Sequence, residues 1–254
     1  MRNLIIKDFE CIYSISIFSN YNLILWENNY NSSNYGKKFL SKEEKDIIKL
    51  TNFHKNMLVG IILSDGYIEK NKNWNPRIRI EQSIKNFEYI WFIFNKLSIL
   101  NNSYPLLIKR LFNNKIFFSL SFRTRQLKCL NEIYYLFYNK NSKKKIIKED
   151  LFHYMNYVTL AYWIMGDGSK IGKGILLCTD SFTLKEVILL MNILKIKFNI
   201  DSTIQYRYSI NLKDRKTKFN NGKKIARIVI NKKNFDIIKD KIKPYFTNDF
   251  LYKL

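Results

Sequence analysis

A short apolar stretch that ends in Asp-Gly occurs twice in this chain, once in each half. The first copy runs from Leu58 to Gly66 and the second from Leu160 to Gly168. Their aspartates, Asp65 and Asp167, lie 102 positions apart (167 − 65), and four of the 8 glycines of the chain fall inside the two copies. In a chain this poor in glycine, the clustering indicates a backbone requirement, because glycine is used where a turn or a close approach leaves no room for a side chain.

The same order of elements follows each copy of the stretch. After the first copy, apolar periodicity predicts a strand, a helix, a strand pair and a helix at 77–82, 87–100, 106–112, 115–122 and 126–138. The corresponding segments after the second copy are 174–178, 183–197, 203–210, 225–230 and 232–245. The stretches themselves are predicted to be helices near 53–65 and 155–167. This repetition predicts an α+β fold built by internal duplication, with pseudo-two-fold symmetry.

Polar and basic segments mark the expected boundaries between parts of the chain. An asparagine-rich and serine-rich stretch at 28–36 suggests that the N-terminal segment is loosely ordered or packs on the outside. We therefore expect an N-terminal extension, a first half, a linker and a second half at 1–45, 46–140, 141–152 and 153–254. Because the duplication supplies both halves within one chain, a monomer is expected.

The charge of the chain narrows the choice of partners. With 44 Lys+Arg against 21 Asp+Glu the net charge is +23, and such an excess repels itself unless a polyanion such as nucleic acid or an anionic membrane is nearby. The codon bias of an AT-rich genome is an alternative, partial cause. No apolar run reaches the roughly 18–20 residues that span a bilayer, so no membrane partner is expected.

The two Asp-Gly stretches have a composition that suits close helix contact. Four small residues would let two helices pack backbone to backbone: Gly60, Ser64, Ala161 and Gly166. If the helices pack in parallel, Asp65 and Asp167 lie side by side at two C-termini, where the helix dipoles and mutual repulsion disfavour both charges. A divalent cation would relieve both effects; carboxylate and carbonyl oxygens suit Mg²⁺, which can activate water at a phosphodiester. The alternative is that each Asp-Gly merely stops a helix.

Basic and amide side chains occupy alternate positions of the predicted strands. Alternation places them on one sheet face, and antiparallel ribbons fit the major groove of DNA, where such side chains read base edges. The candidates for DNA contact are Arg77, Arg79, Arg123, Arg125, Gln205, Arg207 and Arg227, with Lys213, Arg215, Lys223 and Lys224 of the basic loop 211–224 as a clamp on the DNA backbone. The alternative is a solvated sheet face. Neutralising six to ten phosphates would give a slope of roughly −5 to −9 in log affinity against log salt.

The repeated stretch resembles the motif of the LAGLIDADG homing endonucleases, in the single-chain form with two motifs. The second half carries most of the resemblance and is similar to the omega-type mitochondrial intron endonucleases. The matching segments are Leu160-Ala161-Tyr162-Trp163 before Gly166-Asp167-Gly168, then Thr179-Asp180-Ser181-Phe182-Thr183, and finally Ile242-Lys243-Pro244-Tyr245 ahead of Tyr252-Lys253-Leu254. The resemblance covers residues 46–254.

The resemblance implies two αββαββα halves whose antiparallel sheets form a saddle over double-stranded DNA, with the motif helices packed at the centre. It implies Mg²⁺-dependent cleavage of both strands at a long asymmetric site, leaving short 3′ overhangs, with Mn²⁺ or Ca²⁺ able to substitute for binding. The implied metal ligands are Asp65 and Asp167, beside the backbone carbonyls of Ser64 and Gly166. The implied active-site lysines are Lys144 and Lys253, for which an ordinary surface lysine is the alternative.

One position departs from the family pattern. Relatives often carry Gln where this chain has Asp180, whereas Gln82 fits the equivalent place in the first half, with Glu81 one residue away as the alternative. A carboxylate at this position could hold water or metal, or it could weaken the approach of a phosphate. Gln82 and Asp180 are both candidates for a catalytic role, and the carboxylate of Asp180 puts full activity of the second half in question.

Two alternative functions go with the same resemblance. Members of the family can bind intron RNA as splicing maturases, and a third possibility is a DNA-binding protein of this fold with an inactive site. The presence of both motif aspartates favours the endonuclease. The skewed composition and the family together indicate an intron-encoded mitochondrial protein, with a plastid origin as the alternative.

Overall fold

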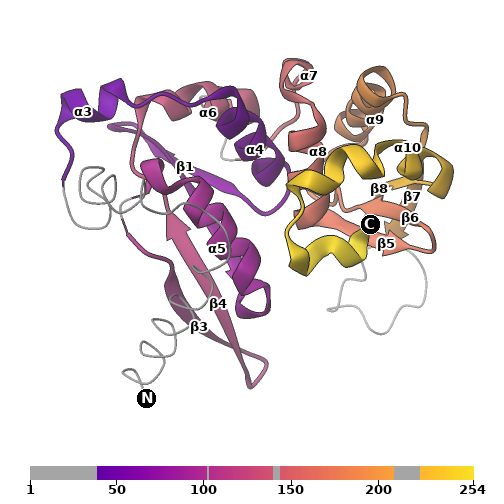
Figure 1. Ribbon diagram of the computed structural model, residues 1–254, viewed down its shortest axis with the longest axis horizontal. Coiled ribbons are helices and arrows are strands. Elements are labelled where there is room, and N and C mark those ends of the chain that lie inside the picture. The colour runs from indigo at the N-terminus through magenta and orange to yellow at the C-terminus, as the bar shows by residue number, and fades with distance from the viewer. Residues whose placement is uncertain (1–38, 102, 140–143, 209–223) are drawn as a thin grey trace.

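The computed structural model of the protein describes residues 39–101, 103–139, 144–208 and 224–254. Two halves, each containing a four-stranded antiparallel sheet, flank a central pair of helices, α4 (Asn52–Leu63) and α8 (Tyr157–Asp167) (Figure 1). The predicted α+β class is therefore confirmed, and both motif stretches are helical. Of the residues described, no helix combines the length and the apolar character that crossing a bilayer requires.

The first half contains seven elements in the order αββαββα, beginning with α4. The others are β1 (Tyr67–Asn71), β2 (Trp74–Ser83), α5 (Phe87–Lys96), β3 (Leu106–Phe112), β4 (Lys115–Arg123) and α6 (Asn131–Phe137). The sheet has the strand order β1-β2-β4-β3. Helices α5 and α6 are shorter than predicted, because one turn of 3₁₀-helix follows α5 and another precedes α6.

The second half repeats this order, beginning with α8. It continues with β5 (Gly168–Ile171), β6 (Gly174–Leu177), α9 (Leu184–Phe198), β7 (Ser202–Tyr208), β8 (Lys224–Ile230) and α10 (Lys232–Ile242). Its strand order, β5-β6-β8-β7, is that of the first sheet. The duplication inferred from the sequence is thus present in the topology. Apolar periodicity alone omitted β1 and β5, which come at the Asp-Gly and are only five and four residues long, whereas the αββαββα order implied by the resemblance includes them.

Two short helices lie at the expected boundaries between parts of the chain. Helix α3 (Lys42–Ile47) begins at a capping box in which Ser41 and Glu44 bond each other's backbone N–H groups. The boundary expected after residue 45 therefore falls inside α3. Helix α7 (Leu151–Tyr154) begins within the expected linker, and the Ile147 backbone N–H before it donates to Glu186 of the second half at 2.9 Å.

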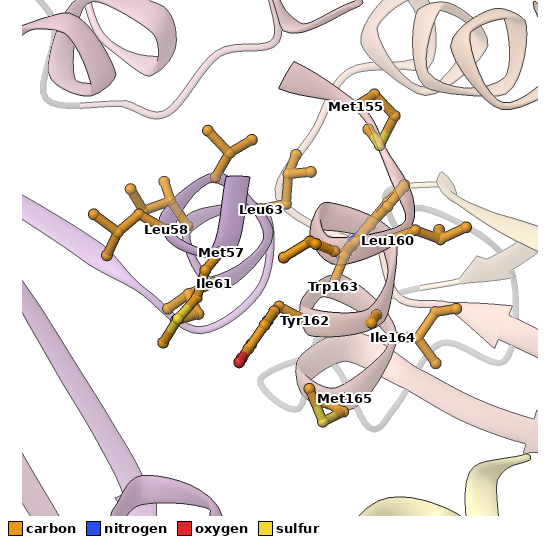
Figure 2. Close-up of a cluster of buried hydrophobic side chains, with 14 of the residues drawn as sticks. Met57, Leu58, Ile61, Leu63, Met155, Leu160, Tyr162, Trp163, Ile164 and Met165 are labelled. Atoms are coloured by element: carbon orange, nitrogen blue, oxygen red, sulfur yellow. The ribbon is translucent and has the colours of Figure 1, made fainter. Parts of the chain in front are cut away.

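The core is continuous across the central helices. Every residue of α4 from Met57 to Leu63 is buried, as is every residue of α8 from Val158 to Met165. Figure 2 shows side chains of both helices in this cluster, with Tyr162 between the two helices. A helix that is apolar on all sides needs cover on all sides, which here comes from the partner helix and from both halves.

Each half covers one face of its sheet with helices and leaves the other face open. In the first half Ile78, Ile80 and Phe122 are buried, and the Phe122 ring lies 5.3 Å from that of Phe94 in α5. Arg77 and Arg79, which alternate with these residues along β2, are only partly buried. The period of the strand thus separates a core face from a polar face.

Candidate functional site

The two central helices pack in parallel and at very short range. Near their N-terminal ends the Thr159 hydroxyl donates to the Asn56 carbonyl at 3.0 Å. Further along, a Cβ atom on Gly60 would lie 2.4 Å from the Thr159 carbonyl oxygen, and one on Gly166 would lie 2.2 Å from the Ser64 hydroxyl. Each helix therefore presents a glycine to the other where no larger residue fits, as small-residue helix contacts require.

This packing brings Asp65 and Asp167 to one place. The Cβ position of Gly166, the residue before Asp167, would lie 3.3 Å from the Asp65 carboxylate. Asp65 is solvent-exposed and its Oδ2 accepts a hydrogen bond of 2.6 Å from the Gln82 side-chain amide. The Asn86 side-chain amide in turn donates to the side-chain oxygen Oε1 of Gln82 at 3.1 Å, which orients the Gln82 amide toward Asp65.

The second carboxylate is in a different electrostatic state. Burial is the main cause that raises the pKa of Asp167 to about 7, and the negative charge of Asp65 adds to it. Lys145 and Lys253 act in the opposite direction. The two carboxylates are therefore close enough to repel each other, and a positive charge between them would be stabilised.

A lysine caps the C-terminal end of each central helix. The Lys145 ammonium donates to the carbonyl oxygens of Ile62, Ser64 and Gly66, the last two at 3.2 Å. Lys253 donates to the Met165 carbonyl at 2.6 Å and to that of Ile164 at 3.3 Å. Such cations are favourable at the negative end of a helix dipole.

Burial gives these two lysines unusual titration properties. It lowers the pKa of Lys145 to about 8 and that of Lys253 to about 8, while the two aspartates oppose the shift. For Lys145 the stronger opposing charge is Asp167, and for Lys253 it is Asp65. Each lysine therefore caps one helix and interacts most strongly with the aspartate of the other.

The position predicted for the first lysine is corrected by one residue. Lys144 is exposed and its charge acts on Glu186 rather than on the aspartates. Lys145 occupies the place beside α4 instead. Lys144 and Lys145 are equivalent in sequence, and only the tertiary structure places Lys145 at the end of α4.

The donor set at the helix ends fits a hard divalent cation. Among the residues described, no group of three or more His, Cys, Asp or Glu side chains could hold a metal ion, so a cation here would rely on Asp65, Asp167, backbone carbonyls and water. Mg²⁺ commonly binds through one or two carboxylates and keeps several waters. Burial is the larger cause of the raised pKa of Asp167, but the negative charge of Asp65 adds to it, and such an ion would offset that charge. Of the expected carbonyl ligands, that of Ser64 already accepts from Lys145 and has a second lone pair to offer.

Asp180 does not take the role that Gln82 takes in the first half. Its carboxylate forms a bidentate ion pair with the Arg227 guanidinium, with the Nε–Oδ1 distance at 2.5 Å. This pairing lowers the pKa of Asp180 and raises that of Arg227. Asp167 thus has a paired carboxylate as its neighbour where Asp65 has a neutral amide.

The polar face of the first sheet carries a network of ion pairs. Arg77 donates to Glu69 at 2.7 Å, and both Arg79 and Arg110 bind Glu81 at 2.9 Å and 2.6 Å. Arg79 and Arg123 are directly opposite each other in the β2–β4 register, so Arg77, Arg79 and Arg123 share this face.

The prediction for Arg125 is wrong as to exposure. Strand β4 ends at Arg123, and the Arg125 backbone N–H donates to the Leu100 carbonyl at 2.7 Å. The Arg125 side chain is only 7% exposed, and burial lowers its pKa. The chain therefore leaves the sheet two residues too early for the alternation to include Arg125.

The second sheet presents three of the predicted side chains on one face. Gln205 and Arg227 are paired in register, and Arg207 follows two positions along β7. Lys224 is a correction: it lies in strand β8 on the same side as the buried Ala226 and Ile228, opposite to the face of Gln205, Arg207 and Arg227, with its ammonium 3.7 Å from the centre of the Tyr206 ring. The other predicted loop residues, Lys213, Arg215 and Lys223, lie outside the described residues.

Three neighbours of the carboxylates were not foreseen from the sequence. These are Lys145, Asn86 and Tyr89. Tyr89 is buried, its hydroxyl pKa is raised well above the usual value by burial, and both aspartates contribute to the rise. Its position in an apolar helix pattern marks it as a core residue, and no sequence signal separates it from the other aromatic residues of α5.

The family of the chain follows from comparison with known proteins. Residues 55–237 match the model of the LAGLIDADG DNA endonuclease family. This chain belongs to that family. The helices α4 and α8 are accordingly its two LAGLIDADG helices, and the fold places them where the family motif predicts.

Relatives of this LAGLIDADG protein carry two kinds of name. A probable intron-encoded endonuclease 1 of Wickerhamomyces canadensis is 32% identical over 229 residues, covering 85% of this chain and 90% of that protein. The cytochrome b mRNA maturase bI2 of Saccharomyces cerevisiae is 33% identical over 208 residues, which are 78% of this chain and 46% of the maturase. The chain thus spans less than half of that longer relative.

A solved structure shares the architecture. The homing endonuclease I-WcaI, bound to its DNA recognition sequence, superposes with a TM-score of 0.70 and 29% sequence identity. The match covers 82% of this chain and 88% of that one. The duplicated LAGLIDADG fold is therefore shared over most of both molecules.

Proposed function

We propose that this protein is a sequence-specific DNA endonuclease that hydrolyses phosphodiesters with Mg²⁺. The observation that carries the proposal is the meeting of Asp65 and Asp167 at two helix C-termini, one capped by the partly buried Lys145 and the other by the buried Lys253. Repulsion between two neighbouring carboxylates destabilises a fold unless a bound cation offsets it. The family membership and the DNA-bound relative support the same reading.

The side chains divide the work of an in-line displacement. Asp65 and Asp167, with the Ser64 and Gly166 carbonyls nearby, would hold Mg²⁺, which supplies an activated water and stabilises the leaving oxygen. Gln82 donates to Asp65 and can orient a water molecule beside it. Lys145 and Lys253, with pKa values of about 8, can stabilise charge on the phosphate or accept a proton.

The two open sheet faces form the proposed DNA interface. Arg77, Arg79 and Arg123 would contact one half of the site and Gln205, Arg207 and Arg227 the other. Because the two faces carry different residues, the site would be long and asymmetric, and cutting both strands would leave short 3′ overhangs as in the family. One chain supplies both faces, so the proposed active species is a monomer.

Cutting of the intronless host gene tests the proposal directly. The full chain should linearise a plasmid carrying that gene with Mg²⁺ and not with EDTA, while Ca²⁺ should support binding. Asp65→Asn and Asp167→Asn should each reduce double-strand cutting at least about 10²–10³-fold, the scale for losing one electrostatic group of an active site, with DNA affinity kept. Cutting at the wild-type rate by either variant would refute the assignment.

The salt dependence of binding tests the interface. Contacts to six to ten phosphates give a slope of roughly −5 to −9 in log affinity against log salt. A slope near zero in a titration of the same duplex would contradict binding by two basic sheet faces.

Splicing of intron RNA is the second candidate function. It is favoured by the relatives named as cytochrome b mRNA maturases, of which one is 33% identical to this chain. An RNA-binding and splicing assay with the host intron, run on the wild type and on Asp65→Asn, separates the two activities. Both activities are those of proteins encoded by introns. We therefore propose that this protein is intron-encoded and is expressed in the mitochondrion.

A further inference from the structure

The β3–β4 hairpin of the first half extends away from the central helices (Figure 1) and exposes large apolar side chains. Leu106 is 65% exposed, Phe112 67% and Phe117 52%. We call these three residues the apolar patch. Each lies opposite a polar or basic residue in the strand register, namely Ser121, Lys115 and Arg110.

The apolar patch lies on the polar sheet face that we propose for DNA binding. Residues directly opposite each other in an antiparallel pair point to the same face. Glu81 of β2 is opposite Ser121, which is opposite Leu106. Arg110, the partner of Phe117, forms an ion pair with the same Glu81. The patch therefore continues the arginine-rich face outward along the hairpin.

The inner and outer parts of this face differ in chemistry. The inner part contains Glu69 and Glu81, which bind Arg77, Arg79 and Arg110. Residues 106–123 contain no Asp or Glu, and they carry four basic residues. The outer part is thus an apolar surface surrounded by basic residues. Such a surface suits a ligand that has anionic groups at its edges and an apolar group between them.

The major groove of DNA offers one apolar feature, the 5-methyl group of thymine, and phenylalanine is among the side chains that contact it. The phosphates that line the groove would lie within reach of the basic residues of the hairpin. Hydrogen-bond donors and acceptors of the other bases find no partner on the apolar patch. Thymine is therefore the base whose edge matches this surface.

We infer that the β3–β4 hairpin reads thymine methyl groups, so that the outer part of one half-site is selected for thymine by apolar contact. The inference rests on the proposed function and specifies its substrate. In the described part of the second sheet the open face carries Gln205 and Arg207 on β7. That half-site would be read by hydrogen bonds, and the two arms of the site would follow different recognition chemistries.

The hairpin is a built ribbon rather than a loose loop. Asn113 and Asn114 both have positive φ values, 48° and 57°, as in the I′ turn that matches strand twist. Seven residue pairs connect β3 and β4 from Leu106–Ser121 to Phe112–Lys115. The apolar patch is therefore held in register with the inner sheet.

Neighbouring residues in β4 provide a matched pair of variants. Phe117 belongs to the apolar patch, whereas Phe118 alternates with it and points to the opposite face of the hairpin. Phe118 is 42% exposed, close to the exposure of Phe117. Phe117→Ser and Phe118→Ser should therefore lose similar packing, and only the first should lose thymine recognition.

Replacing thymine by uracil removes the methyl group and leaves every hydrogen bond in place. The probe is a duplex selected by the full chain from a pool of random duplexes, with deoxyuridine placed at single positions along each arm. Each contacted methyl should contribute about fourfold to affinity, the scale for burying one carbon group. The loss should occur at the outer positions of one arm only.

The variants decide which side chain makes the contact. With Phe117→Ser the uracil penalty should disappear, with Phe117→Leu it should persist in part, and with Phe118→Ser it should be unchanged. Equal uracil penalties in the wild type and in Phe117→Ser would overturn the inference, as would the absence of any penalty in the outer arms.

The same experiment separates this inference from the proposed function. A selected duplex that is cut with Mg²⁺ but is insensitive to uracil would overturn thymine reading alone. Failure to select any preferred duplex would overturn both, since the hairpin would then have no DNA sequence to read.

Discussion

The two halves of this protein share a backbone plan but surround their aspartates differently. Asp65 is exposed and accepts a hydrogen bond from Gln82, whereas Asp167 is partly buried beside the Asp180–Arg227 ion pair. Both helices nevertheless end under a lysine, Lys145 in one half and Lys253 in the other.

This contrast separates the features that the two halves share from the residues that differ between them. The strand order, the close helix contact and the lysine caps are common to both halves. The residues one step away from the carboxylates differ: Gln82 donates to Asp65, whereas the Asp180–Arg227 ion pair lies beside Asp167. The surroundings of the two aspartates can thus differ without a change of fold.

The largest expected effect concerns the two lysine caps. Lys145→Met and Lys253→Met should each lower the cutting rate about 10²–10³-fold, because each removes a cation beside the reacting phosphate. Lys144→Met should cut at nearly the wild-type rate, because Lys144 is exposed. Strand-resolved nicking assays would also reveal whether each lysine serves one strand.

Because Lys144 and Lys145 are adjacent and chemically identical, comparing their variants tests which of the two acts at the end of α4. If Lys144→Met were the inactive variant and Lys145→Met the active one, the structural correction would be wrong. Thermal unfolding of each variant separates loss of chemistry from loss of the helix cap.

A smaller effect is expected at the glycines of the helix contact. Gly60→Ala should lower the free energy of unfolding by about 1–3 kcal/mol, because the new methyl group would meet the backbone carbonyl of Thr159 and force the helices apart. Gly166→Ala would meet the side chain of Ser64 instead. Ser64→Gly should therefore restore much of the stability lost in Gly166→Ala.

Urea unfolding of the single and double variants measures this coupling. The Gly166–Ser64 pair should show an interaction energy of about 1 kcal/mol, whereas Ser64→Gly should not rescue Gly60→Ala. Equal rescue of both variants would contradict the contacts described for the two ends of the helices.

The smallest predicted effect concerns the pH dependence of stability without metal. The raised pKa of Asp167 means that the folded protein keeps a proton that the unfolded chain releases, so stability falls as the pH rises from about 4 to about 7. Asp167→Asn removes this loss. Allowing for solvent screening, it should raise the melting temperature by about 2–4 °C at pH 8 in EDTA, and by less at pH 5.

Asp65→Asn provides the comparison from the other half. It removes the charge that is the second cause of the shift in Asp167, after burial, so its stabilising effect at pH 8 should be smaller. Melting curves of the three proteins at both pH values check the order. A larger gain for Asp65→Asn would mean that repulsion, rather than burial, dominates at Asp167.

Much of the fold could be read from local periodicity. The two apolar stretches are helices, and the alternation in 77–82 separates Ile78 and Ile80 from Arg77 and Arg79 as predicted. The short strands β1 and β5 were missed because they contain too few residues for a period to be visible. Arg125 was misplaced because the end of β4 is set by contacts with residues around Leu100, which are distant in sequence.

The meeting of Asp65 and Asp167 could also be anticipated, because small residues at fixed spacing dictate how two helices approach. The identity of the lysine could not. Lys144 and Lys145 are chemically the same, and only the tertiary structure shows that Lys145 reaches the carbonyl groups at the end of α4.

By itself, the sequence determined the duplication, the order of elements, the apolar helices and the positive charge, since these follow from composition and short-range periodicity. The tertiary structure decided which charges are buried, which are paired and which remain open to a ligand. The physical reason is that desolvation and ion pairing depend on neighbours far apart in the chain. Asp65 and Asp167 occupy the same place in the same motif, and only the fold gives them different exposure and different neighbours.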